Sequence, residues 1–206
     1  MEKKKSHLYF VDALGVEFLA YIQEQCYKRG LDFSAKIGYC NLPSITSMNK
    51  EFVDEFSSCT SIKSLDELKH DGQFDYNYEK VKQPIHLVEE LAIIDEVISR
   101  IDSDLQQGSL EQVSIVSDHG SSRMAVIAES ENKWEMSEKG QHSGRCCPKS
   151  DLDIKPDCAI EENDFYILLN YDRFKGGRKA NVEVHGGASL EEVLVPIIEI
   201  TKRVKL

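Results

Sequence analysis

The chain has 206 residues, of which 41% are hydrophobic and 30% are charged. These ordinary globular values argue against a disordered or fibrous chain, and the length suits one domain, residues 1–206, with a buried sheet. The formal net charge of −11 repels nucleic-acid phosphates on average, so a phosphate-bearing substrate requires a local cluster of cations.

The six cysteines occur without a secretory signal sequence, because the basic N-terminal run is followed by only a few apolar residues. We therefore expect reduced thiols and a cytoplasmic location. No stretch of about 18 consecutive apolar residues occurs, so neither a membrane span nor a membrane partner is expected.

Short apolar runs alternate with helical patterns along the chain. Two segments place apolar side chains three and four positions apart, which predicts helices at residues 15–29 and 85–101. The alternation predicts an α/β fold, a three-layer α/β/α sandwich with a mostly parallel central sheet. The apolar runs with the composition of strands are residues 7–11, 34–40, 113–116, 165–169, 181–184 and 194–201.

A polar segment interrupts this alternation in the second half of the chain. Residues 130–155 contain Gly140, Gly144 and Pro148 among polar side chains. Glycine and proline break regular elements, so the segment predicts an exposed insertion or lid at about residues 130–160 rather than part of the core.

Acidic and imidazole side chains follow two of the predicted strands directly. Asp12 follows the first strand, and Asp118 with His119 follows the strand at residues 113–116. Ligands of open α/β sheets bind outside the carboxyl ends of the strands, so we expect these side chains to meet at one rim. Carboxylates that meet there repel one another unless a cation is bound, and Asp with His suits zinc or a similar divalent ion. Taken singly, Asp12 is equally typical of a helix cap.

The order of these motifs resembles a known superfamily. Asp12 after the first strand, a PSIT loop at residues 43–46, SDHG at residues 117–120 and a late His185 are similar to the alkaline phosphatase superfamily. More narrowly, VEVHGGASLEEVLVPIIEI, NYDRFKGGRKAN and the opening VDALG resemble the PglZ family of bacterial phage-exclusion (BREX) systems over nearly the whole chain. Members of that family are commonly larger, which leaves open that this chain is the C-terminal domain of a longer protein.

The resemblance implies a role for individual residues. Asp12, Asp118 and His119 would hold one divalent cation that also binds Thr46, and Thr46 would attack phosphorus as the catalytic nucleophile. His185 would bind a second cation. The resemblance implies one or two cations per chain, zinc first, with manganese or magnesium as alternatives.

The remaining ligands of the second cation stay open. The superfamily usually supplies an Asp and a His four residues apart, between the nucleophile and SDHG. Asp66 and His70 have this spacing, but they lie in a segment with a helical pattern. His86, at the start of the long predicted helix, is the other candidate.

Several basic and thiol side chains are further candidates for contacts. Lys175 and Arg178, in the basic run of residues 173–179, could bind a substrate phosphate, and so could Arg145 in the expected lid. A zinc knuckle is a further alternative, although adjacent cysteines fit tetrahedral ligation poorly and no CxxC pair occurs. Its ligands would be His142, Cys146, Cys147 and Cys158.

Two functions are consistent with these features. The first is a metal-dependent phosphohydrolase of a phage-defence system, a phosphomonoesterase or phosphodiesterase whose phosphate-containing substrate could be a nucleotide or a nucleic acid. The alternative is an alkaline-phosphatase-like module with little or no activity that binds other phage-defence proteins, which the lack of a clear Asp-and-His pair favours. The physiological substrate does not follow from these residues, because a metal rim recognises phosphate and leaves specificity to surrounding loops.

Overall fold

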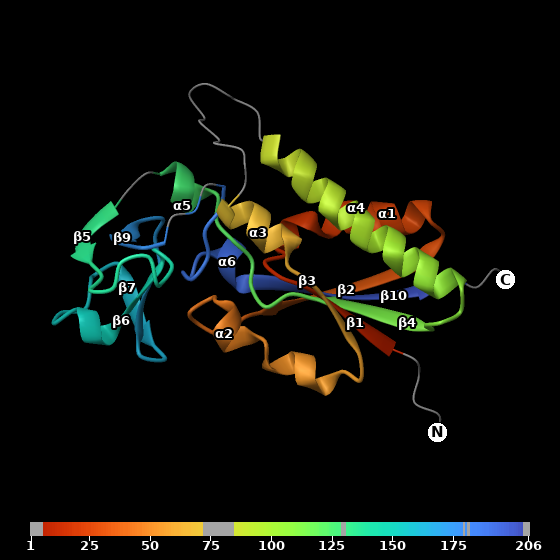
Figure 1. Ribbon diagram of the computed structural model, residues 1–206, viewed down its shortest axis with the longest axis horizontal. Helices are drawn as coiled ribbons and strands as arrows, with labels where there is room; N and C mark the ends of the chain where they lie inside the picture. Colours follow the sequence, from red (N-terminus) through yellow and green to blue (C-terminus); the bar gives the residue numbers. More distant parts are fainter. Residues whose placement is uncertain (1–5, 72–84, 129–130, 179, 181, 204–206) are drawn as a thin grey trace.

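A computed structural model describes residues 6–71, 85–128, 131–178, 180 and 182–203. The molecule is a mixed α/β structure (Figure 1). Its elements in chain order are β1 (Ser6–Val11), η1 (Val16–Phe18), α1 (Leu19–Lys28), β2 (Leu31–Tyr39), α2 (Thr46–Asn49), η2 (Glu51–Glu55), β3 (Cys59–Ile62), α3 (Ser64–Asp71), α4 (Ile85–Gln106), β4 (Gln112–Val116), α5 (Met124–Ile127), β5 (Glu131–Glu135), β6 (Cys146–Pro148), η3 (Lys149–Asp151), β7 (Ala159–Glu162), β8 (Phe165–Leu168), β9 (Arg173–Lys175), α6 (Leu190–Val193) and β10 (Leu194–Lys202).

A mixed five-stranded sheet in the order β2-β10-β4-β1-β3 forms the centre of the molecule. β1 is parallel to β3 and to β4, whereas β10 is antiparallel to β4 and to β2. The register of β1 and β4 places Phe10 opposite Val116. The two strands therefore end side by side, and the residues that follow them start from the same edge of the sheet.

Helices lie on both sides of this sheet. In Figure 1, α1, α3 and α4 run along one side, and α2 with η2 lies on the other. Ile94, Ile98 and Ile101 of α4 recur at helical spacing and share one buried core with Ile22 of α1 and Ile115 of β4. Each such side chain contributes about 1.5–3 kcal/mol when it is fully buried, so this core fixes the layer of helices against the strands.

Residues 131–178 form a smaller unit beside the central sheet. It contains a two-stranded sheet, β5-β9, and a three-stranded sheet, β6-β8-β7 (Figure 1). Met136, Cys147 and Phe174 belong to a second buried cluster within it. The segment predicted as a lid thus contains strands and a core of its own, although residue 130 lies outside the described residues. These strands have three to five residues, too few to produce a clear hydrophobic period.

Most of the other predicted elements are present. The predicted helices correspond to η1 with α1 and to α4, and four predicted strands correspond to β1, β2, β4 and β10. The apolar run at residues 165–169 is β8 of the smaller unit. In the predicted strand at 181–184, residue 181 lies outside the described part, and residues 182–184 instead donate backbone hydrogen bonds to Lys69 O and Ser122 O. No helix in the described part of the chain is long and apolar enough to cross a bilayer.

Candidate metal centre

The ends of β1 and β4 bring three potential ligands together. Asp12 follows β1, and Asp118 and His119 follow β4; all three are buried. One ligand atom from each lies within 4.8 Å of the other two. His119 Nε2 lies 3.3 Å from Asp118 Oδ2 and 3.7 Å from Asp12 Oδ1. Asp118 Oδ2 has no hydrogen-bond partner among the described residues. We refer to these three residues as the Asp12 cluster.

Hydrogen bonding fixes which ring nitrogen of His119 faces this cluster. Its Nδ1 lies 2.9 Å from the carbonyl oxygen of Gly120, which can only accept, so Nδ1 carries a proton and donates it. A neutral imidazole then has its lone pair on Nε2, directed at the two carboxylates. An outer hydrogen bond of this kind is typical of metal-ligating histidines.

Thr46 brings a hydroxyl group to the same cluster. It is the first residue of α2, after the loop that follows β2. Its Oγ1 lies 3.3 Å from His119 Nε2 and 3.5 Å from Asp12 Oδ1. The sequence predicts that the Asp12 cluster and Thr46 follow three separate strands, and the fold brings their side chains into contact.

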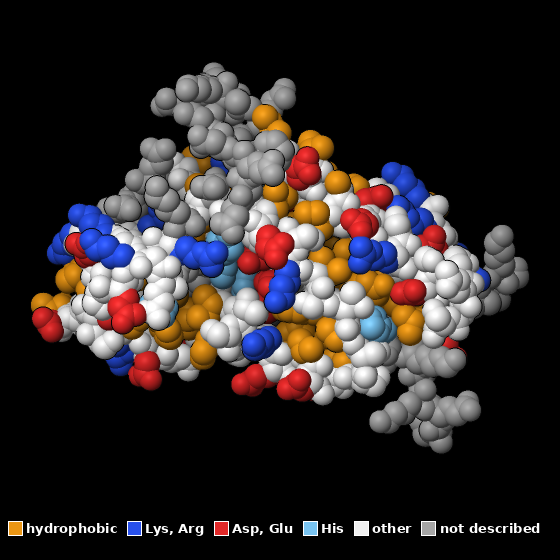
Figure 2. Space-filling view, in the orientation of Figure 1, with side chains coloured by type: hydrophobic (Ala, Val, Ile, Leu, Met, Phe, Trp, Pro, Cys, Tyr) orange, Lys and Arg blue, Asp and Glu red, His pale blue; other side chains and the backbone are white. Residues whose placement is uncertain are grey.

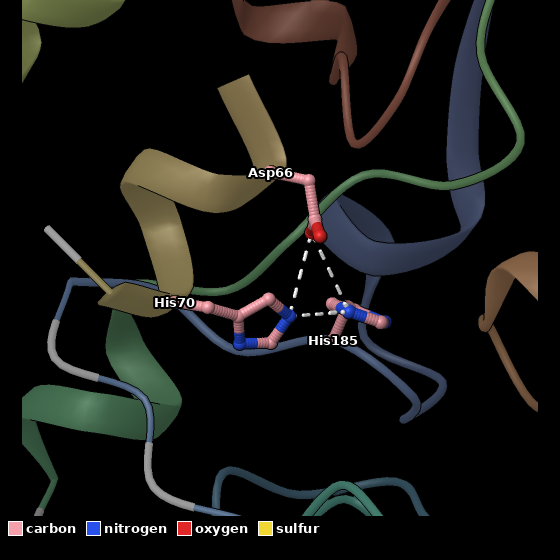
Figure 3. Close-up of side chains that lie close together, drawn as sticks. All are labelled: Asp66, His70 and His185. Carbon is pink, nitrogen blue, oxygen red and sulfur yellow. Dashed lines mark hydrogen bonds and ion pairs between the residues drawn. The ribbon is translucent and has the colours of Figure 1, made fainter. Parts of the chain in front are cut away.

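A second cluster lies beside the first. Asp66 and His70 project from α3, one turn apart, towards His185 from the segment before α6 (Figure 3). Asp66 Oδ1 lies 3.4 Å from His70 Nε2 and 3.6 Å from His185 Nε2, and the two imidazole nitrogens are 2.8 Å apart. His185 Nδ1 donates to Ser44 O at 2.9 Å, so its Nε2 lone pair faces the cluster. We refer to these three residues as the Asp66 cluster.

The two clusters adjoin through a pair of histidine rings. His119 of the Asp12 cluster and His185 of the Asp66 cluster stack with centroids 3.9 Å apart. Figure 2 shows histidine atoms reaching the surface beside acidic atoms between the smaller unit and the central sheet. Two sites so close together could hold a pair of cations that act on one substrate group.

No protein-family model and no curated protein matches this sequence.

Burial and neighbouring groups shift the pKa of one side chain in each cluster. Burial, followed by repulsion from Asp118 and Asp66, raises the pKa of Asp12 to about 8, against the opposing effect of Lys63. Burial and the neighbouring His119 and His70 rings lower the pKa of His185 well below its ordinary value. In the folded protein these shifts favour a protonated Asp12 and a neutral His185.

Buried Lys69 links the segments that carry these ligands. Its Nζ donates to Ala13 O at 2.9 Å and to Ser121 Oγ at 2.7 Å, and it lies 3.0 Å from Glu183 Oε2. Its carbonyl oxygen accepts from the N–H groups of Val182 and Glu183. Lys69 therefore joins the turn after β1, the segment after β4 and the strand-like segment before His185 to α3, which carries Asp66 and His70.

The structure separates the two candidates for the second site. Asp66 and His70 join His185, because α3 follows directly after β3 and starts from the same sheet edge. His86, at the start of α4, instead lies near Glu90 and Glu183 in a third group of ligand-type side chains. Glu90 and Glu183 were not among the ligands predicted from the sequence; the signal available for Glu90 was its four-residue spacing from His86 on one helix.

Two cavities open beside the clusters. A cleft of about 580 Å³ is lined by Asp12, Thr46, Asp66, Lys50 and Lys63, among others. A smaller cavity of about 220 Å³ lies on the side of the smaller unit. Its lining includes His70, His185, Arg178 and His142. Of the two basic residues predicted for substrate, Arg178 thus lies beside the Asp66 cluster, whereas exposed Lys175 at the end of β9 lines neither cavity.

Arg145 and the cysteines do not take the roles considered for them. Arg145 is fully buried and forms a double contact with Glu192, at 3.0 Å from Nε and 2.9 Å from Nη2. It holds the smaller unit to α6 and does not face either cavity. The proposed knuckle residues form no close ligand group in the described part of the chain; these are His142, Cys146, Cys147 and Cys158.

Proposed function

We propose that this protein is a metal-dependent phosphohydrolase of the alkaline phosphatase superfamily, related to the PglZ family. The observation that carries the proposal is the contact between two three-ligand clusters, with the Thr46 hydroxyl at one of them. A three-layer α/β/α sandwich with a mostly parallel sheet is part of the proposal. The parallel pairing of β1 with β3 and β4 and the helices on both sides of the sheet support it.

The donor sets suit divalent cations. Two carboxylates with one imidazole in the Asp12 cluster, and one carboxylate with two imidazoles in the Asp66 cluster, favour zinc, with manganese or magnesium as alternatives. Asp118 Oδ2 and Asp66 Oδ1, which have no hydrogen-bond partner among the described residues, are the oxygens that such ions would use. When bound, the cations supply positive charge for the phosphoryl oxygens and lower the pKa of a nearby hydroxyl.

Thr46 supplies the nucleophile. Its Oγ1 forms a bond to phosphorus while the bond from phosphorus to the leaving oxygen breaks, and that oxygen takes a proton from water. The Thr46 proton passes towards Asp12 Oδ1, 3.5 Å away. The hydroxide left when water protonates the leaving oxygen then attacks phosphorus, the bond between Oγ1 and phosphorus breaks, and Oγ1 takes back the proton held by Asp12, so the threonine hydroxyl is regenerated.

A phosphate-containing substrate fits the larger cleft. Lys50 and Lys63 line it beside Thr46, and they provide the local cations that this acidic chain needs to attract an anion. Lys63 lies close enough to Asp12 to oppose the rise in its pKa. The substrate class is a phosphate monoester or diester, including nucleotides and nucleic acids.

One observation favoured the alternative, a module with little or no activity that binds other proteins. That observation was the lack of an Asp-and-His pair, but Asp66 and His70 form such a pair with His185. Association with other phage-defence proteins, and a location in the cytoplasm, remain part of the proposal. The six free cysteines support a reducing compartment.

Turnover of nitrophenyl phosphate and bis-nitrophenyl phosphate, with zinc or manganese added to chelator-treated protein, tests the proposal. Thr46→Ala should abolish turnover, whereas Thr201→Ala, on β10, should retain it. Acid quenching of the wild type during turnover should trap phosphate on Thr46, detectable by mass spectrometry. A fully metallated wild type that hydrolyses neither ester would overturn the enzyme proposal.

A further inference from the structure

A third group of ligand-type side chains is separate from the Asp12 cluster and the Asp66 cluster. His86 and Glu90 lie one turn apart on α4, and Glu183 reaches them from the segment that carries His185. One ligand atom from each lies within 4.8 Å of the other two. His86 is 5% exposed, Glu90 1% and Glu183 9%. Two carboxylates are thus held in a nearly water-free space.

Lys69 could neutralise the carboxylate of Glu90, but its three N–H donors already have other partners. An ammonium group has three N–H donors, and Lys69 directs them to Ala13 O, Ser121 Oγ and Glu183 Oε2. Glu90 Oε1 is buried and has no hydrogen-bond partner among the described residues. Burial raises the pKa of Glu90, and the charges of Lys69 and Arg123 oppose that rise. A buried carboxylate oxygen without a hydrogen-bond partner is still costly, and a cation or a proton bound to Glu90 Oε1 would remove that cost.

One carboxylate oxygen of Glu183 is held in place by two other side chains. Its Oε2 accepts from Ser121 Oγ at 2.6 Å and lies 3.0 Å from Lys69 Nζ. Carboxylates that bind metals are commonly held in this way through the second oxygen.

Burial lowers the pKa of His86, which therefore presents a neutral imidazole. Burial and the negative charge of Glu183 raise the pKa of Glu90 to about 8, although Lys69 opposes the rise. A divalent ion held between His86, Glu90 and Glu183 would satisfy Glu90 Oε1.

We propose that His86, Glu90 and Glu183 form a third cation site, separate from the two clusters around Thr46. One imidazole and two carboxylates select a transition-metal dication such as Zn²⁺ or Mn²⁺ over Ca²⁺, which prefers oxygen ligands alone. The ion joins the first turn of α4 to the segment that carries His185. The role of this ion is therefore structural. The inference of a third site does not depend on the proposed phosphohydrolase activity.

The test counts cations on the full chain. Chelator-treated protein is reloaded with Zn²⁺ or Mn²⁺, freed of excess ion, and its content measured by mass spectrometry of the metal. We expect three equivalents in the wild type, and one fewer in Glu90→Gln, which keeps the shape of the side chain. Glu89→Gln, an exposed neighbour on α4, is the matched control and should retain three. The Zn²⁺-loaded wild type should also melt at a higher temperature than loaded Glu90→Gln.

Anomalous scattering at the zinc edge from crystals of the loaded wild type locates the ions without any substitution. A peak between His86, Glu90 and Glu183 supports the site, and its absence overturns it even if a variant folds poorly. Asp118→Asn separates this inference from the proposed function. If Asp118→Asn loses an equivalent and Glu90→Gln does not, the third site is wrong and the centre at Thr46 stands. The reverse result overturns that centre and leaves the third site.

Discussion

The imidazole rings of His119 and His185 lie face to face, with their planes 17° apart. Each ring directs Nε2 into a different cluster, and each is held at Nδ1 by a backbone carbonyl, of Gly120 and of Ser44. The stacked pair is therefore the physical connection between the Asp12 cluster and the Asp66 cluster. A change in one ring displaces a ligand of its own cluster and removes support from the other.

His185→Ala should cost one bound cation. The Asp66 cluster would keep only Asp66 and His70, too few protein ligands for a tight site, whereas the Asp12 cluster keeps all three of its ligands. Metal content after reloading with Zn²⁺ measures the loss. His7→Ala, at the start of β1 and outside every ligand group, is the control. Unchanged metal content in His185→Ala would show that the Asp66 cluster binds no ion.

Lys69→Met should destabilise the fold by about 3–5 kcal/mol, because it leaves the buried carboxylate of Glu183 without its partner. Urea unfolding measures the change in the free energy of unfolding. Lys28→Met is the control, since Lys28 pairs with Glu24 on the exposed side of α1 and its loss should cost less than about 1 kcal/mol. Equal effects of the two substitutions would contradict the structural role assigned to Lys69.

Gly120→Ala should weaken the Asp12 cluster. A Cβ atom at this position would lie 2.1 Å from the carbonyl oxygen of Glu191, and a backbone atom cannot move aside as a side chain can. The segment after β4 must shift, at a cost of about 1–3 kcal/mol, and His119 shifts with it.

Isothermal titration of chelator-treated Gly120→Ala with Zn²⁺ measures the effect on the cluster. Gly15→Ala provides the comparison, because a Cβ there meets only the flexible end of the Glu17 side chain. Zinc affinity should fall in Gly120→Ala alone. Wild-type affinity in that variant would mean that the contact with Glu191 does not position His119.

The cation-free protein should lose stability as the pH rises from about 6.5 to about 8; at lower pH the lowered pKa values of His185 and His86 make stability change in the opposite direction. The pKa of Asp12 is raised to about 8 in the folded protein, so in this window the folded state keeps a proton that the unfolded state has released. Stability then falls with increasing pH by up to ~1 kcal/mol per pH unit from this group, and Glu90 acts in the same direction. Above pH 8 both states are ionised and the fall ends.

Urea unfolding in chelator at pH 6.5, 7, 7.5 and 8 checks this dependence. Asp12→Asn should flatten it, because the amide does not titrate. Added Zn²⁺ should reverse the trend, since protons compete with the ion for the same oxygen atoms and are released as the pH rises. A wild type whose cation-free stability increases over this range would contradict the raised pKa.

Much of the candidate centre followed from the sequence because its residues are tied to strand ends. Asp12, Asp118 and His119 come directly after short apolar runs, and parallel strands that pair side by side deliver the residues after them to one edge. The smaller unit was harder to predict. Its strands are short, and its largest fully buried side chain is Arg145, whose charge suggested an exposed position until Glu192 was found opposite it.

The sequence by itself determined which residue types lie at the ends of the strands, that Asp66 and His70 occupy one helix face, and that His86 lies on another helix. Only the tertiary structure decided which of these two faces meets His185. Hydrophobic periodicity reports the buried side of a helix, but the partner of a polar side chain depends on where that helix packs. Here α3 begins at the sheet edge beside His185, whereas α4 lies along the sheet and directs His86 to Glu183.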